Sequence, residues 1–300
     1  MRLLVAALAL VAAAAHSQPT TVPPGHGQGG VFDSLSVTVM DADGAPLALD
    51  ALVDRMAETD VVYLGEIHDD SLGHVAQLRL FGAVLRNARA EGRGVVLAME
   101  MFESDVQTVL DEYRAGTIEE RDFLAASRPW SNYARDYRPL VEAAKAHGVH
   151  VVASNAPMRY VRLASREGLD ALDGLSAAAR ALLPPLPITP PSDAVADAFR
   201  ALMGDMAGHG GGPSVDGMLV GQNLRDATMG YRVARALRAP DRPIVVHLNG
   251  SFHSLGGRGI PEHVARLIPS VRQLVVTMSP SRPEPGSGDV LIWTAPDAAP

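Results

Sequence analysis

The sequence predicts an α/β fold with a mostly parallel central sheet, helices on both faces of the sheet and a helical insertion. Short apolar runs rich in β-branched residues recur along the chain, and such runs suit strands that are covered on both faces. Longer segments with helical spacing alternate with them, as expected for parallel strands joined by crossover helices. The expected strands lie at residues 61–64, 95–98, 149–153, 244–248 and 273–278.

The connecting segments complete this prediction. An edge strand or hairpin at residues 34–40 is followed by an acidic-glycine turn at 41–44 and a helix at 49–58. Residues 184–191 contain five prolines in eight positions, so neither a helix nor a central strand can cross this connector into the helical insertion. The other helices are expected at residues 75–90, 105–115, 139–147, 159–167, 193–206, 216–237 and 261–267.

The N-terminal residues have the pattern of a secretory signal peptide. Arg2 supplies the positive charge, residues 3–15 form an apolar core, and Ala15-His16-Ser17 is a small-x-small cleavage site. An uncleaved membrane anchor is the alternative, but the apolar run is shorter than the roughly 20 residues that span a bilayer. We therefore expect a periplasmic or secreted protein with a signal peptide at residues 1–17, a flexible N-terminal segment at 18–30 and a single domain at 31–300.

Composition argues against several classes of function. The chain has no cysteine, which excludes disulfides, thiolate metal sites, cysteine nucleophiles and a lipid-attachment cysteine. Its net charge of -8 argues against a nucleic-acid partner, since phosphate binding needs clustered Lys and Arg. No apolar window is long enough for a membrane span.

Polar residues follow four of the expected strands. They are Glu66 and His68 in the segment Gly65-Glu66-Ile67-His68, then Glu100, then Asn155, then His253 in Gly250-Ser251-Phe252-His253. Because open parallel sheets bind ligands outside the carboxyl ends of their strands, we expect these side chains to meet at one edge. The glycine that begins each Gly-x-x-His segment is predicted to let the chain turn sharply off its strand and a ligand approach the backbone.

These strand-end residues also have a structural interpretation. His68 alone would be a helix-start histidine bonded to a neighbouring carboxylate, and Glu66 and Glu100 would be core carboxylates with satisfied hydrogen bonds. The occurrence of His68 and His253 in the same local pattern favours the functional interpretation.

Other segments offer further candidates. Residues 130–139 combine aromatic and arginine side chains before a helix, either as packing or as a flat wall for a planar ligand. Gln222 and Asp226 share one face of the longest expected helix, where a polar pair often binds something. His74 is predicted to be either a ligand or a surface residue, and His247 a hydrogen-bonded core histidine.

The sequence lacks the motifs of several common enzyme classes. The second Gly-x-x-His segment has no second glycine, so it does not match the hydrolase elbow Gly-x-Ser-x-Gly. There is no P-loop, no dinucleotide-binding Gly-x-Gly-x-x-Gly after the first strand and no His-Glu-x-x-His.

Taken in order, these segments resemble the ChaN-like haem-binding proteins of the Tiki/TraB/erythromycin-esterase-like superfamily. The resemblance extends over residues 55–280. Two departures stand out: this leader lacks the cysteine of the family's lipoproteins, and His68-Asp69-Asp70-Ser71 replaces the frequent His-Asp-Asn-Pro. The matching segments are residues 65–70, 99–103, 155–157, 222–229, 250–253 and 259–261.

The resemblance implies an exported protein of haem or iron uptake that binds haem through a tyrosine and forms a homodimer. Tyr137 and Tyr133 are then the candidate iron ligands, in a crevice roofed by residues 130–137. The other expected haem-binding residues are His68, His74, Asn155, Gln222, Asp226 and His253.

Distant members of the same superfamily imply an alternative, a metal-dependent peptidase or esterase. Glu66, His68, Glu100 and His253 would be its catalytic residues, acting directly as acid and base or through a divalent metal ion. The metal would be held by Glu66, His68 and His253 and would activate a water molecule. A third hypothesis is a structural or interaction protein in which the strand-end polar residues only cap helices.

Overall fold

A computed structural model of the chain describes residues 35–204 and 214–295, so the expected signal peptide and the segment at 18–30 lie outside the described residues. The centre of the fold is a seven-stranded sheet in the order β1-β7-β6-β2-β5-β3-β4. Its parallel strands confirm the mostly parallel sheet that the sequence predicts. They are β2 (Val61–Glu66), β3 (Val95–Glu103), β4 (His150–Asn155), β5 (Ile244–Gly250) and β6 (Gln273–Ser279), with β7 (Val290–Trp293) next to β6.

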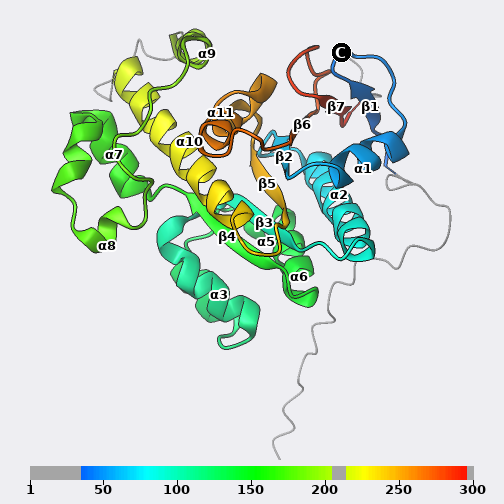
Figure 1. Cartoon of the computed structure of the whole chain (residues 1–300), viewed down its shortest axis with the longest axis horizontal. Coiled ribbons are helices and arrows are strands. Elements are labelled where there is room, and N and C mark those ends of the chain that lie inside the picture. Colours follow the sequence, from blue (N-terminus) through cyan, green and yellow to red (C-terminus); the bar gives the residue numbers. More distant parts are fainter. Residues whose placement is uncertain (1–34, 205–213, 296–300) are drawn as a thin grey trace, which may run out of the picture.

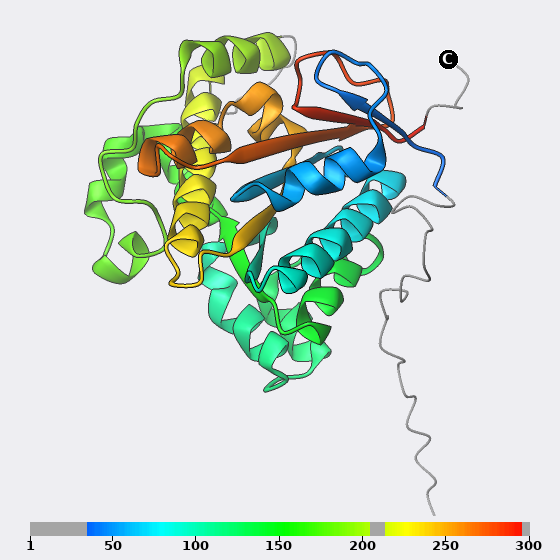
Figure 2. The same cartoon turned by 45° about the vertical axis from the view of Figure 1, so that its right-hand side comes forward.

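The strand β1 (Thr38–Asp41) lies at one edge of the sheet and pairs antiparallel with β7. Strand β7 was not predicted, since its apolar run is only four residues long. Figure 2 shows β1 and β7 side by side at this edge, close to the helix α1 (Leu49–Ala57). The two strands extend the sheet away from β4, so they take no part in the carboxyl-end cluster described below.

Helices cover both faces of the sheet (Figure 1), which confirms the predicted α/β layering. One face carries α1, α2 (Ser71–Ala90) and α6 (Arg138–Ala146), and the other carries α10 (Val215–Leu237) and α11 (Ile260–Leu267). The helical insertion between β4 and α10 contains α7 (Met158–Glu167), α8 (Ala177–Arg180) and α9 (Asp193–Gly204). The remaining elements are α3 (Gln107–Ala115), α4 (Glu120–Ser127), α5 (Tyr133–Asp136) and the 3-10 turns η1 (Ser104–Val106), η2 (Leu169–Gly174), η3 (Ser251–His253) and η4 (Leu255–Gly257).

Within the described residues, none of the helices is both long and apolar enough to cross a membrane.

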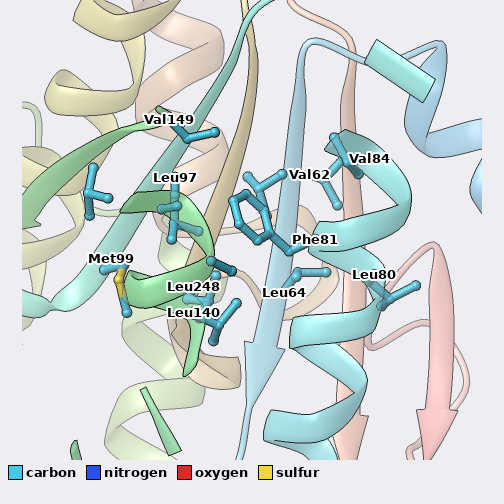
Figure 3. Packing of buried hydrophobic residues seen from close by; sticks show 14 of the residues in the cluster. Val62, Leu64, Leu80, Phe81, Val84, Leu97, Met99, Leu140, Val149 and Leu248 are labelled. Carbon is cyan, nitrogen blue, oxygen red and sulfur yellow. The ribbon is translucent and has the colours of Figure 1, made fainter. Parts of the chain in front are cut away.

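The two-residue period of each strand divides the core into two layers. In β2, Val62 and Leu64 belong to the cluster under α2, whereas Val61 and Tyr63 belong to the cluster under α10 and α11. Figure 3 shows the first layer, where Phe81 of α2 packs over the sheet. A strand whose two faces are both buried is apolar throughout, which is why the sequence predicted these strands as continuous runs.

The outer edge of the sheet at β4 is covered by the side chain of Gln107. The Gln107 amide donates to the carbonyl of Val151 and accepts from the amide of Ala153, both at 2.8 Å. The side chain thus pairs with β4 as a neighbouring strand would, which limits edge-to-edge association at this strand.

Candidate functional site

The carboxyl ends of β2, β5 and β3 are neighbours in the sheet, and their polar residues converge on one cavity of about 850 Å³. Glu66, His68 and His253 line this cavity together with Gly250. Glu100 is buried beneath it and accepts a hydrogen bond from the amide of Gly250 at 2.7 Å. The structure thus brings residues from both Gly-x-x-His segments to one place.

The two glycines make room for each other's segments. A Cβ atom on Gly250 would lie 2.8 Å from Cε1 and 3.0 Å from Nε2 of His68, and one on Gly65 would lie 3.2 Å from Cα of Ser251. Gly250 has an ordinary φ of -56°, so a sharp turn does not require glycine there. The prediction that these glycines permit a turn off the strand is therefore wrong, and close packing between the two segments is the physical reason for them.

A buried network fixes the first segment. Glu66 Oε1 lies 2.9 Å from His68 Nδ1 and accepts a hydrogen bond of 2.6 Å from the hydroxyl of Tyr137, while Oε2 accepts one of 2.7 Å from Gln77. His74 Nε2 lies 3.0 Å from the carbonyl oxygen of His68, so His74 holds the backbone of His68 while Glu66 holds its ring. The carboxylate of Glu66 therefore fixes the orientation of the His68 imidazole.

These contacts alter the pKa values in the first segment. Burial alone would raise the pKa of Glu66, but hydrogen bonds from His68 and His74 and the charge of His74 lower it. The hydrogen bond to Glu66 raises the pKa of His68. Burial opposes protonation of His74, yet Glu66 raises its pKa to about 9. The buried pair of Glu66 and His74 is therefore ionised near neutral pH.

The second segment is enclosed by carboxylates. His253 Nε2 lies 3.2 Å from Glu100 Oε1, and His253 Nδ1 contacts Asp226 and lies 2.9 Å from the Gln222 side-chain amide. Burial disfavours the charged imidazole, but the charges of Glu100 and Asp226 raise the pKa of His253 to about 10. Burial alone would raise the pKa of Glu100, but the charge of His253 outweighs the effect of burial and lowers this pKa to about 2.

Asp226 behaves differently from Glu100. Burial raises the pKa of Asp226 despite the attraction of His253, and the nearby charge of Glu100 raises it further. Two carboxylates that share one imidazolium are pushed apart in pKa by their mutual repulsion. The two carboxylates that flank His253 therefore shift in opposite directions, the pKa of Glu100 downward and that of Asp226 upward.

The cavity is lined mainly by apolar side chains and by three arginines. Met158 and Val161 of α7, Phe199 of α9, Met218 of α10 and Phe252 of η3 line it. Arg162, Arg166 and Arg225 also line it. We did not predict these lining residues. The signal was present in the expected helix 159–167, where Arg159, Arg162 and Arg166 recur at helical spacing after a strand end.

Several expected site residues lie outside the cavity lining. Tyr137 is fully buried with its hydroxyl bonded to Glu66, and Tyr133 is 3% exposed and packs in the core beside Phe123. Burial raises the pKa of both phenols. Neither phenol lines the cavity, because both rings pack in the hydrophobic core instead of roofing a crevice.

His74 and Asn155 are likewise buried away from the cavity. His74 is 4% exposed, so the surface alternative for this residue is wrong; it lies inside α2, which begins earlier than predicted. Asn155 donates to the carbonyl of Glu100 and accepts from the amide of Ala156, which joins the ends of β3 and β4. His247 is a core histidine, as predicted, and lies 3.1 Å from Ser154 Oγ.

The described part of the chain contains no group of three or more His, Cys, Asp or Glu side chains arranged to hold a metal ion. The expected ligands Glu66 and His253 make their hydrogen bonds to protein groups instead.

A family model and two solved structures show what this chain is similar to. A family model described as haem-binding uptake, Tiki superfamily, ChaN, matches residues 52–264. A solved structure titled as cofacial heme binding to ChaN of Campylobacter jejuni shares the fold, with a TM-score of 0.65 and 17% identity over 85% of this chain and 96% of that one. A mutant of the erythromycin esterase EreC in its open conformation gives a TM-score of 0.46 at 11% identity, over 85% of this chain and 82% of that one.

One curated relative is a plant protein. RETICULATA-RELATED 5, chloroplastic, of Arabidopsis thaliana is 23% identical in an alignment of 274 residues that covers 83% of this chain. The match spans only 36% of the length of that relative.

Proposed function

Because this chain belongs to the ChaN family of haem-binding uptake proteins in the Tiki superfamily, we propose that it binds haem in the cavity at the carboxyl end of the sheet. A cavity of about 850 Å³ with walls such as Phe199 and Phe252 suits a large, flat, apolar ligand. The haem propionates would pair with Arg162 and Arg225, which line the cavity. When bound, haem would supply an iron centre whose electronic properties depend on its axial ligand.

The observation that carries this proposal is the setting of His68. Its side chain is 46% exposed and lines the cavity, while Glu66 holds its Nδ1. Among the described residues Nε2 has no hydrogen-bond partner, so it is the nitrogen available to iron. A carboxylate on the far nitrogen is the arrangement that fixes the tautomer of a ligating histidine and makes it more basic. We therefore favour His68 over Tyr137 and Tyr133 as the iron ligand.

A haemin titration followed by Soret absorbance tests the proposal. Native protein is expected to bind haemin with a saturable Soret shift, and His68→Ala is expected to weaken binding by at least about tenfold and to change the band position. Tyr133→Phe is the matched control and should bind as the native protein does. A lost Soret band in Tyr133→Phe or Tyr137→Phe with a normal band in His68→Ala would instead support tyrosine ligation.

Export and a role in haem or iron uptake form the finer part of the proposal. They are supported by the leader pattern of residues 1–17 and by the family. N-terminal sequencing of the protein from its native host should find Gln18 as the first residue.

A homodimer belongs to the same proposal. Ile67 at the cavity is 43% exposed, and Leu72 and Val75 nearby in sequence are 39% and 38% exposed. Light scattering with and without haemin tests it.

The Glu66 and His68 pair also favours a second function, hydrolysis of an ester or amide. An imidazole held by a carboxylate, with its second nitrogen free beside a cavity, is suited to remove a proton from water. In that role His68 would be the general base and the buried His253 cation would stabilise negative charge. Hydrolysis of aryl esters that disappears in both His68→Ala and Glu66→Gln supports this function, and an unchanged rate excludes it.

A further inference from the structure

A second cavity lies at the opposite end of the strands from the proposed haem cavity. It has a volume of about 670 Å³ and is lined by Val95 at the start of β3, His150 at the start of β4 and residues near the end of α10. Its charged lining is net positive, with four arginines against two aspartates, in a chain whose net charge is -8. These side chains are Arg89, Arg93, Arg232, Arg235, Asp111 and Asp241.

The partners of these charges differ. Arg93 contacts Asp60 at 3.6 Å and donates to the carbonyl of Ala57, and Arg89 donates to the carbonyl of His147. Asp111 accepts a hydrogen bond from Gln107 at 3.1 Å. These groups are therefore partly satisfied by the protein itself.

Arg232 and Arg235 are less well compensated. Neither has a carboxylate within ion-pair distance among the described residues. Arg232 is half-buried, its Nε is buried without a hydrogen-bond partner in the described chain, and its Nη2 makes only a long bond of 3.4 Å to the carbonyl of Leu182. Arg235 is exposed and lies over the ring of Tyr231 at 5.9 Å. An arginine removed from water normally pairs with an anion, because an uncompensated buried charge is costly.

The pKa values of three groups that line this cavity reflect its burial and its arginine charges. Burial and the charge of Arg235 lower the pKa of Arg232. Burial and the charge of Arg89 lower the pKa of His147. Burial lowers the pKa of His150, although Asp111 opposes that shift. Burial is the main cause of each shift, and the charges of the arginines that line this cavity add to it for Arg232 and His147.

We propose that this cavity is a binding site for a small polyanion, whose phosphate or carboxylate groups are held by Arg232 and Arg235. Planar guanidinium groups bind both anions through paired hydrogen bonds, and two arginines that are three residues apart on a helix present adjacent forks. The site shares no lining residue with the haem cavity. It therefore stands whether or not haem is bound there.

Calorimetric titration of the full protein with pyrophosphate, against sodium chloride of equal ionic strength, tests the site. Saturable binding of one pyrophosphate per chain is expected, and Arg232→Gln should weaken it by at least about tenfold, as expected for loss of a charge-assisted hydrogen-bonded pair. Citrate titrated in parallel separates the two ligand chemistries, since the tighter of the two anions identifies the preferred group. No saturable binding of either anion, or equal affinity in Arg232→Gln, overturns the proposal.

Two further variants serve as controls for this test. Arg121→Gln removes the same charge at a side chain that is 80% exposed and outside the cavity, and it should bind pyrophosphate as the native protein does. Arg235→Gln weakens binding in the same direction at an exposed position, and it decides the matter if circular dichroism shows that Arg232→Gln is unfolded. If pyrophosphate displaces haemin, the anion binds the arginines of the first cavity instead, and this result would also overturn the proposal.

Discussion

The two Gly-x-x-His segments have the same pattern in the sequence and different surroundings in the structure. The side chain of His68 is 46% exposed and has one carboxylate on one nitrogen, whereas that of His253 is 9% exposed and has carboxylates on both nitrogens. The first arrangement leaves His68 Nε2 without a hydrogen-bond partner among the described residues. The second makes the histidine a buried cation that ties β3, α10 and β5 together.

The difference arises from which elements surround each ring. His68 follows β2 in an open loop, and its ring meets Trp130 edge-on with centroids 4.9 Å apart. His253 lies in η3 beneath α10, which supplies Asp226 and Gln222 from above while β3 supplies Glu100 from below. A shared motif therefore fixes the position of the backbone, and the neighbouring helices decide whether the imidazole is exposed at the cavity or enclosed by carboxylates.

The largest effect that this comparison predicts is on stability. His253→Ala leaves Glu100 and Asp226 buried without their cation, and breaking a buried pair in this way costs about 3–5 kcal/mol of unfolding free energy. His68→Ala is the matched change at the exposed histidine and should cost less than about 1 kcal/mol, as most surface changes do. Urea unfolding at neutral pH measures both. Equal losses in the two variants would contradict the division of roles.

The sequence predicted the positions of these residues better than their roles. Parallel strands buried on both faces are continuous apolar runs, so β2, β3, β4 and β5 could be predicted, and with them the edge where Glu66, Glu100 and Gly250 meet. The four-residue β7 lacks enough residues to give such a signal. Strand order brings chain-distant residues together, so it depends on tertiary packing that periodicity does not encode.

The same limit explains the differences between the expected and the observed site. Gly250 is needed because His68 packs against it, and Gly65 because the backbone of Ser251 packs against it. No local sequence pattern shows such a contact between two distant segments. Tyr137 and Tyr133 have the amphipathic side chains of ligand contacts, yet an aromatic ring buries as readily in a core, and here both do. The arginines of α7 were visible as a helical series, but only the fold shows that Arg162 and Arg166 line the cavity.

An intermediate effect is expected on the pH dependence of haem binding. The hydrogen bond to Glu66 raises the pKa of His68 above its ordinary 6.5, so the imidazole is increasingly protonated as pH falls through that raised value. A proton and iron compete for Nε2, so the apparent affinity for haemin should fall by up to about tenfold per pH unit below the pKa. At higher pH the affinity should level off. Titrations between about pH 5 and 9 measure the curve.

Two variants isolate the contribution of His68 to that curve. His68→Ala should lose the pH-dependent part while retaining any change that comes from haemin itself. Glu66→Gln removes the charge that favours the imidazolium, so the fall in affinity should move to lower pH. A native curve that matches that of His68→Ala would show that His68 does not ligate the iron.

The smallest predicted effect separates the position of His68 from its chemistry. In Gly250→Ala the new Cβ would meet Cε1 of His68 at 2.8 Å, and the ring must move because it is the side chain that can yield. A shifted rotamer costs about 0.5–1.5 kcal/mol, so haemin affinity should fall by about threefold to tenfold while unfolding free energy changes little. Gly174→Ala is the matched control, since its Cβ would meet nothing within 4 Å. Unchanged haemin affinity in Gly250→Ala would mean that the ligand does not depend on where the ring of His68 lies.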